Sequence, residues 1–222
     1  MLYNVLEVSF KLIFSTYMNN KLTKGHYVEI LLRSPQTVFS VRDIALFWRE
    51  EAKNAVRVRL YDYVKTGKLI RVHHGIYAKD ENYSRFELAT RIYTPSYLSF
   101  ETVLTRSGIN FQYYKTLFVA SYVTREIEVR NQKISFVRMK DYVLSNTAGI
   151  EYLDGVATAT KERAFLDRIY VSKDYHFDNL GALDWNKVFE LLPIYYNERM
   201  EKKVKMYFEH YRSTHLDITK KI

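Results

Sequence analysis

The order of local signals between residues 40 and 78 constrains the fold more than any other feature of the sequence. Ser40 can act as the N-cap of a short helix. A longer helical pattern spans residues 50–65 and is followed by Gly67, the residue type that most often ends a helix in a left-handed conformation. Two short strands then surround a turn at residues 73–75. A helix, a tight connection, a longer helix and a β-hairpin in this order are typical of a winged helix-turn-helix.

The neighbouring segments extend this unit in both directions. A helix is predicted from Thr23 to Arg33, because Pro35 disfavours helix at the residue before it. A polar run at residues 79–82 marks a change in the character of the chain. We therefore expect a leader at residues 1–18, a winged helix-turn-helix DNA-binding domain at residues 19–80 and a C-terminal domain at residues 81–222.

The C-terminal domain is predicted to be α+β, with helices packed around a small antiparallel sheet. Apolar runs and charged–apolar alternation predict strands at residues 116–122, 126–130 and 133–139. Helical spacing predicts helices at residues 84–93, 99–106, 161–170, 184–192 and 197–211. Ser99 is expected to cap the second of these helices. The whole chain is therefore predicted to be an α+β protein.

The helix predicted at residues 50–65 divides into two faces at 100° per residue. The stripe that should be buried contains Val56, Leu60, Tyr63 and Val64, with Ala52 at its margin. The opposite side presents Asn54, Val58, Tyr61 and Lys65. An asparagine can read adenine through two hydrogen bonds, an arginine can read guanine, and an outward valine suits a thymine methyl group. This face is therefore predicted to enter a groove of DNA.

The candidate DNA contacts combine this face with the start of the preceding helix and with the hairpin. Phosphate contacts position such a unit on the duplex, and base contacts specify the sequence. The predicted DNA-binding residues are Ser40, Arg42, Lys53, Asn54, Arg57, Val58, Arg59, Tyr61, Arg71, His73 and His74. A metal site at His73 and His74 is not expected, because consecutive side chains in a strand point to opposite faces. No catalytic residue, metal or cofactor is predicted.

The charge of the chain is concentrated in the same segment. The sequence contains 34 Lys and Arg against 25 Asp and Glu, a net charge of +9. Residues 49–79 alone hold 8 basic against 3 acidic residues, a net charge of +5. A local basic excess of this kind favours nucleic acid, an anionic membrane or an acidic protein as the partner.

Composition excludes several other classes. The absence of cysteine removes disulfide frameworks, thiol nucleophiles and Cys-ligated zinc or iron–sulfur sites. No stretch approaches the roughly 20 apolar residues that span a bilayer. Residues 1–17 lack the basic start, the uninterrupted apolar run and the cleavage site of a secretory signal, and fit an amphipathic helix or a poorly ordered extension. We expect a cytoplasmic protein without a membrane partner.

Three blocks of the sequence resemble one family in the same order. The blocks are YDYVKTGKLIRVHHGIY at residues 61–77, PSYLSFETVL at residues 95–104 followed by Gly108, and ATKERAFLD at residues 159–167. They resemble the corresponding blocks of AbiEi-type antitoxins, the transcriptional regulators of bacterial abortive-infection, type IV toxin–antitoxin operons. The sequence departs from the family pattern at Val103, where alanine is common, and at Arg163, where lysine is common. The leader has no counterpart in the pattern.

The resemblance implies a non-enzymatic regulator. It implies binding to inverted repeats in operator DNA, repression of the protein's own operon and neutralisation of a nucleotidyltransferase-like toxin. In type IV systems a stable complex between toxin and antitoxin is not required. The sequence is compatible with a monomer in solution and leaves the oligomeric state open.

Two other functions stay open at this point. The first is a winged-helix transcription factor whose C-terminal domain senses a small molecule, which a deep apolar pocket lined by the 20 tyrosines would favour. The second is a metal-dependent nuclease that uses Glu126 and Glu128 with Lys133. Strand alternation explains these three residues as a solvated face, and no separate aspartate on a suitable element completes a nuclease site. Asp167 is expected to pair with Arg163 at helical spacing.

Overall fold

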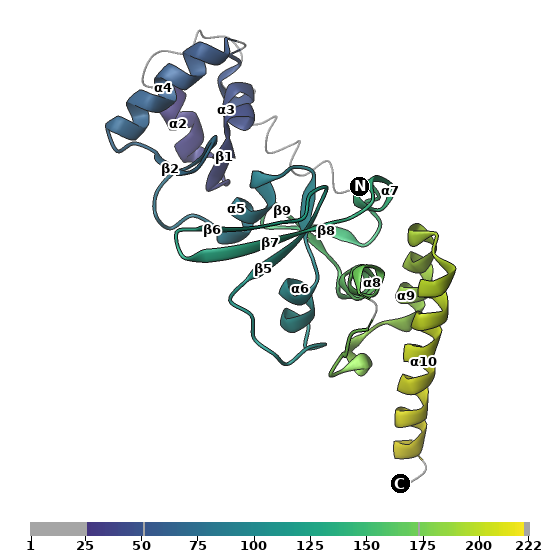
Figure 1. Ribbon diagram of the computed structural model, residues 1–222. Coiled ribbons are helices and arrows are strands. Elements are labelled where there is room, and N and C mark those ends of the chain that lie inside the picture. Colours follow the sequence, from purple (N-terminus) through teal and green to yellow (C-terminus); the bar gives the residue numbers. More distant parts are fainter. Residues whose placement is uncertain (1–25, 51, 173, 220–222) are drawn as a thin grey trace.

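The structure, a computed structural model, describes residues 26–50, 52–172 and 174–219 (Figure 1). The leader expected at residues 1–18 and the helix start expected at Thr23 lie outside the described residues. Within the described part the chain is a mixed α+β protein, as the sequence predicted.

The first part of the chain forms three helices and a small sheet. Its elements are α2 (His26–Arg33), β1 (Val38–Ser40), α3 (Val41–Trp48), α4 (Lys53–Lys65), β2 (Ile70–His73) and β3 (Ile76–Ala78). The strands form an antiparallel sheet in the order β1-β3-β2. The three helices and the β2–β3 hairpin overlap segments that the sequence predicted in the same state.

Local chemistry explains where these elements begin and end. Ser40 caps α3 through a capping box, in which its hydroxyl accepts from the Asp43 N–H and the Asp43 carboxylate accepts from the Ser40 N–H. Gly67 follows α4 with φ of +68°, a left-handed conformation that glycine adopts without a steric penalty. In the hairpin turn, the Gly75 carbonyl accepts a hydrogen bond from the Val41 N–H at 3.0 Å. The hairpin is thereby fixed to the start of α3.

The second part is built on a larger sheet. Its helices are α5 (Arg85–Ile92), α6 (Glu101–Arg106), α7 (Asp141–Leu144), α8 (Lys161–Val171), α9 (Trp185–Leu191) and α10 (Glu198–Thr219), with two 3-10 turns, η1 (Leu180–Ala182) and η2 (Leu192–Tyr195). Its strands are β4 (Ser96–Leu98), β5 (Leu117–Ser121), β6 (Arg125–Val129), β7 (Gln132–Arg138), β8 (Ile150–Leu153) and β9 (Val156–Ala159). They form one sheet in the order β6-β7-β5-β4-β9-β8.

The prediction of a small antiparallel sheet for this part is wrong. The sheet has six strands and is mixed, because β4 pairs parallel with β9 and β5 pairs parallel with β7. Strands β4, β8 and β9 span three or four residues each and were not predicted. Hydrophobic alternation identifies a strand but does not show which strands pair with it or in which direction. The sequence pattern therefore could not predict the two parallel pairs.

Helix α5 lies between the two sheets. It contacts β1 and β3 of the small sheet and β4, β5 and β9 of the large one. Figure 1 shows α5 on one side of the large sheet and α6 and α8 on the other. Val38, Ile76 and Ala78 of the small sheet share one buried core with Leu88 and Ala89 of α5. The boundary between two domains that the sequence places at residue 80 stays a prediction. Apolar side chains from before and after this residue pack together in one core.

A buried polar network ties α8 to the large sheet. The predicted pair of Arg163 and Asp167 is confirmed, with 3.3 Å between Nε and Oδ1 and neither side chain exposed. Asp167 also accepts hydrogen bonds from the hydroxyls of Ser99 at 2.7 Å, Tyr195 at 2.7 Å and Tyr97 at 3.3 Å. Burial raises the pKa of the Asp167 carboxyl group, while Arg163 and the hydroxyl donors oppose this.

Ser99 does not cap α6, in contrast to the prediction. The N-cap residue is Phe100, whose φ of 53° and ψ of −140° turn the chain sharply into the helix. The Ser99 hydroxyl is instead committed to Asp167, a partner 68 residues away in the sequence. A cap prediction considers only local partners, and a distant carboxylate displaced them here.

Breaking the Arg163–Asp167 pair on one side should strongly destabilise the second part. We expect Asp167→Asn to lower the free energy of unfolding by about 3–5 kcal/mol, because it leaves the buried Arg163 guanidinium without its counter-charge. Arg212→Ala, which removes an exposed pair with Glu209 on α10, should change it by less than about 0.5 kcal/mol. Urea unfolding followed by circular dichroism measures both values. Similar losses in the two variants would contradict this account.

Candidate nucleic-acid interface

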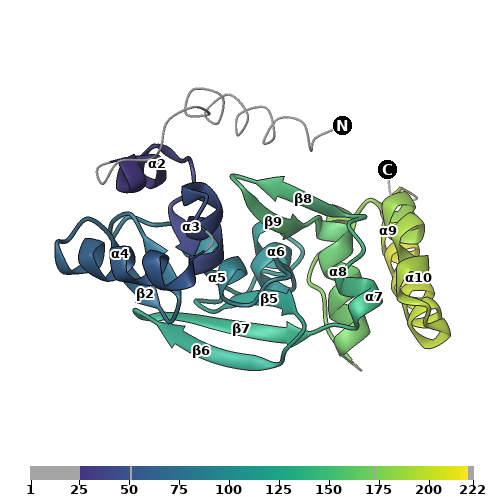
Figure 2. The ribbon, with the colours of Figure 1, turned by 90° about the horizontal axis from the view of Figure 1, so that it is seen from above.

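Helix α4 has a buried side and an exposed side, as its sequence predicted. Val56, Leu60 and Tyr63 are buried, and Val64 is half-buried. They pack in one cluster with Val28, Leu31, Phe39, Ile44, Trp48 and Leu69 from the surrounding elements. Burying each such side chain contributes roughly 1.5–3 kcal/mol, so this cluster holds the helix in place. In both views of the ribbon, α4 lies at the end of the molecule opposite α10 (Figures 1 and 2).

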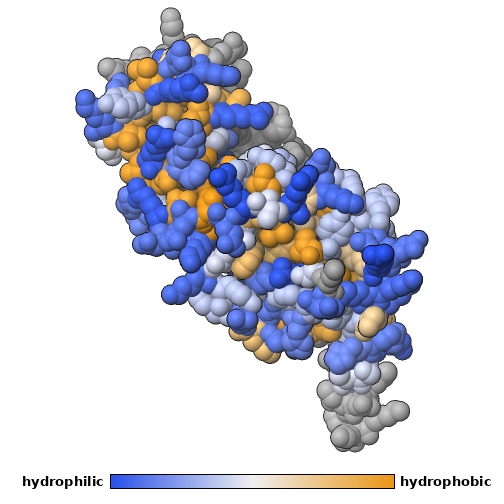
Figure 3. Space-filling view, in the orientation of Figure 1, coloured by the Kyte–Doolittle hydropathy of each residue, from blue (hydrophilic) through white to orange (hydrophobic). Residues whose placement is uncertain are grey.

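The exposed side of α4 carries groups that suit a DNA groove. It presents Lys53, Asn54, Arg57, Val58, Tyr61 and Lys65, all exposed. Val58 and Tyr61 are 62% and 66% exposed, although apolar and aromatic side chains are usually covered. Figure 3 shows apolar surface between hydrophilic side chains over this part of the molecule. Cations, an amide and an apolar contact on one helix face are the groups that contact phosphates, base edges and thymine methyl groups.

Arg59 differs from the other predicted contacts on α4. Its Nη1 atom lies 2.8 Å from Oε2 of Glu50, and its guanidinium lies 4.2 Å from the centre of the Tyr27 ring. The hydrogen bond between Arg59 and Glu50 lowers the pKa of Glu50 and raises the pKa of Arg59. Arg59 therefore connects α4 to α2 and to the turn before α4. The predicted role in DNA binding stays a prediction for this residue.

The other predicted residues gather where the start of α3 meets the hairpin. Arg42 is exposed beside Ser40, and Ser40 pairs with Ile76 in the register of the small sheet. On the hairpin, Nη2 of Arg71 lies 3.0 Å from Nδ1 of His74, and both side chains are exposed. The structure thus brings the predicted residues into two groups, one on α4 and one at the α3 start and hairpin turn.

His73 is placed differently from its neighbour. It is half-buried, and its Nδ1 atom is buried without a hydrogen-bond partner in the described part of the chain. The residues that the structure describes contain no group of three or more histidine, cysteine, aspartate or glutamate side chains that could hold a metal ion.

Sequence reasoning missed two residues of α5 that contact the first part of the chain. Glu87 is 5% exposed and accepts hydrogen bonds from the start of β1, and Arg91 pairs with Asp43 at 2.8 Å. A carboxylate between Phe86 and Leu88 in an apolar stretch is a signal that could have drawn attention to Glu87, because buried carboxylates require partners. The residues near Glu87 in the sequence do not show which groups it bonds to.

The groups that motivated the other functions lie apart from this interface. Glu126 and Glu128 are exposed on β6, at an edge of the large sheet. A cleft of about 480 Å³ lies between the β8–β9 hairpin and helices α6, α8 and α9. Three basic residues (Arg106, Lys161 and Lys187) and three acidic residues (Glu151, Glu162 and Asp184) line it, and no tyrosine does. A ligand-sensing domain was expected to contain a deep apolar pocket lined by tyrosines. This cleft is lined by charged residues and by no tyrosine.

No protein-family model matches the chain, and no curated protein sequence matches it. Among the described residues, no helix is long and apolar enough to cross a membrane.

Arg57 and Arg59 should differ in their effect on stability. We expect Arg59→Ala to lower the melting temperature by about 2–4 °C, the change that a loss of about 1 kcal/mol produces in a chain of this length, because it removes the contact with Tyr27. Arg57→Ala should leave the melting temperature within about 1 °C, because exposed substitutions of this kind have small effects. Differential scanning calorimetry on the two variants tests this, and equal shifts would contradict the placement of Arg59.

Proposed function

We propose that this chain is a DNA-binding transcriptional repressor of its own operon and the antitoxin of a type IV, abortive-infection toxin–antitoxin system. The single observation that supports DNA binding best is the exposed face of α4, where Asn54, Arg57, Val58 and Tyr61 lie above an apolar core. The proposed partners are operator DNA with inverted repeats and a nucleotidyltransferase-like toxin.

The first part of the chain is proposed to be a winged helix-turn-helix. The element order α2-β1-α3-α4-β2-β3 and the sheet order β1-β3-β2 support this interpretation. In the proposal α4 is the recognition helix and the β2–β3 hairpin is the wing. Arg42 and Arg71 would contact phosphates, and Asn54, Arg57 and Val58 would contact base edges.

The antitoxin role is proposed on the resemblance of residues 61–77, 95–104 and 159–167 to AbiEi-type antitoxins. We assign this role to the second part of the chain, because the proposed DNA-reading face lies on the first. The proposed neutralisation does not require a stable complex with the toxin.

Substitutions on α4 should separate affinity from stability. We expect Arg57→Ala and Asn54→Ala each to weaken binding to the DNA upstream of this chain's own reading frame by about 1–3 kcal/mol. Wild-type affinity should fall steeply with salt, because lysine and arginine contacts release counterions from DNA. Gel-shift titrations at several salt concentrations measure both effects.

The matched control for this experiment is Arg199→Ala on α10, which also removes one exposed positive charge. It should bind the same fragment with wild-type affinity. If Arg57→Ala and Asn54→Ala bind as tightly as the control, α4 does not present the recognition face.

The two proposed activities should also be separable. A double variant, Asn54→Ala with Arg57→Ala, should lose repression of a reporter placed behind the upstream DNA. It should still restore growth to cells that express a nucleotidyltransferase-like toxin encoded beside this chain. Loss of both activities at a normal protein level would place neutralisation on the α4 face and contradict the assignment to the second part.

A further inference from the structure

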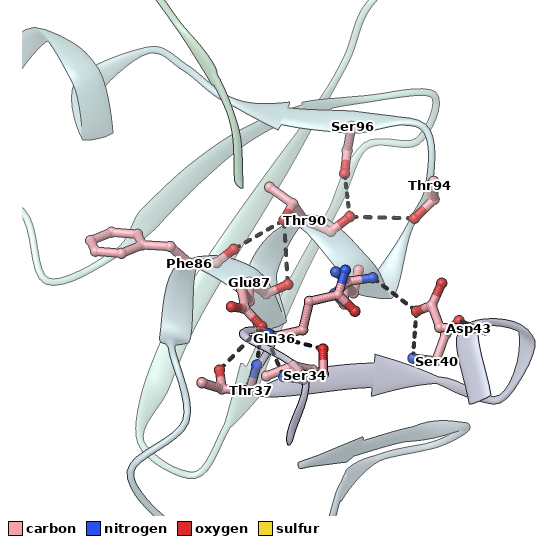
Figure 4. A network of polar contacts seen from close by, with 12 residues as sticks. Ser34, Gln36, Thr37, Ser40, Asp43, Phe86, Glu87, Thr90, Thr94 and Ser96 are labelled. Atoms are coloured by element: carbon pink, nitrogen blue, oxygen red, sulfur yellow. Dashed lines mark hydrogen bonds and ion pairs between the residues drawn. The ribbon is translucent and has the colours of Figure 1, made fainter. Parts of the chain in front are cut away.

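Two residues of α5 hold the start of β1 and the start of α3 from outside the first part of the chain. Oε2 of Glu87 accepts hydrogen bonds from the N–H groups of Thr37 and Val38, each at 2.8 Å, and from the Thr37 hydroxyl at 3.1 Å. The Thr37 hydroxyl in turn accepts from the Ser84 N–H at 2.8 Å. Figure 4 shows the Glu87 carboxylate next to Thr37 at the start of β1. One buried carboxylate thus fixes three donors.

Arg91 acts one turn further along α5. Its Nη1 atom lies 2.8 Å from Oδ2 of Asp43, the same oxygen that accepts the Ser40 N–H in the capping box. The two side chains are 17% and 28% exposed, so this ion pair is screened less than one on the open surface. Arg91 therefore attaches α5 to the N-terminal cap of α3.

These contacts reach the second group of the candidate interface directly. Ser40 and Arg42 belong to the segment that Asp43 anchors, and the Val41 N–H bonds to Gly75 in the hairpin turn. The α4 group lies on an apolar cluster that includes Phe39 of β1 and Ile44 of α3. Both groups therefore rest on β1 and α3, the elements that Glu87 and Arg91 hold against α5.

We propose that Glu87 and Arg91 are positioning residues of the DNA interface. This inference rests on the proposed function and extends it to residues that do not touch DNA themselves. Both groups of the interface must meet one duplex at the same time, and specific contacts tolerate displacements of only about 0.5 Å. Non-specific binding follows the charge of the surface and depends little on such geometry. The two residues therefore support specific affinity in particular.

Asp43→Asn tests this proposal because a loss of positioning and a gain of positive charge should change the affinity for DNA in opposite directions. The asparagine keeps an oxygen that can accept the Ser40 N–H, but it loses the ion pair with Arg91. It also makes the protein more positive, which by itself would tighten binding to DNA. We expect specific affinity for the upstream DNA to fall about tenfold, with unchanged or tighter binding to a scrambled duplex of equal length.

The remaining variants separate positioning from simple loss of charge. Arg91→Ala should weaken specific binding about tenfold, and Arg91→Lys, which keeps the charge and can restore one ion pair, should recover most of it. Glu87→Gln keeps one acceptor oxygen and should bind better than Glu87→Ala, which leaves the β1 donors unpartnered. Asp141→Asn, an exposed aspartate on α7, is the matched control and should bind as wild type. Melting temperatures identify any variant that fails to fold.

A distance measurement supplies a readout that does not involve DNA. The chain contains no cysteine, so spin labels can be attached at Asp62→Cys on α4 and Glu128→Cys on β6, both exposed. Pulsed electron paramagnetic resonance should give a narrow distance distribution in the otherwise wild-type chain. It should give a broader distribution when Asp43→Asn or Arg91→Ala is added.

The outcomes distinguish the two proposals. Loss of specific binding in Asp43→Asn and Arg91→Ala, with recovery in Arg91→Lys and a broadened distribution, supports the positioning role. Specific binding that equals wild type in folded Asp43→Asn, Arg91→Ala and Glu87→Ala overturns the positioning role and leaves the proposed function intact. If the wild-type chain does not distinguish the upstream DNA from the scrambled duplex, the proposed function fails and the positioning role fails with it.

Discussion

The N–H groups of Thr37 and Val38 point from the start of β1 toward α5, where a single carboxylate oxygen of Glu87 accepts both. A buried N–H without a partner costs about 1–3 kcal/mol, and a buried carboxylate without donors costs more. The contact removes both penalties at once. It also allows Val38 and Ala78 to pack in the core that they share with α5. The position of the first part on the large sheet follows from this contact.

Local chemistry was sufficient to predict the first part of the chain and insufficient for its attachment. The Ser40 cap, the left-handed Gly67 and the buried stripe of α4 depend on residues within a few positions of each other, so their patterns are visible in the sequence. Glu87 meets partners that lie 49 and 50 residues earlier, and nothing near it identifies them. The same limit applied to Arg59, which the sequence predicted as a DNA contact. Its guanidinium lies beside the Glu50 carboxylate and over the Tyr27 ring, and neither contact could be predicted from the helical pattern.

Phe100 shows how the second part accommodates an unfavourable backbone conformation. A φ of 53° with a ψ of −140° costs a non-glycine residue about 1–3 kcal/mol. The residues on either side of it both bond to α8, Ser99 to Asp167 at 2.7 Å and Glu101 to Arg168 at 3.0 Å. The Phe100 side chain itself is fully buried. These contacts hold the sharp turn between β4 and α6 against its intrinsic cost.

The same contacts change the meaning of the family resemblance. Residues 95–104 and 159–167 supply Tyr97, Ser99, Arg163 and Asp167, which meet in one buried network. Side chains inside that network cannot touch a toxin, so these two blocks bear on the fold of the second part and not directly on the proposed antitoxin activity. An antitoxin surface on the second part would have to use exposed side chains outside the network. The network's contribution to neutralisation would then be to hold that surface in shape, as Glu87 and Arg91 are proposed to do for the proposed DNA-binding surface.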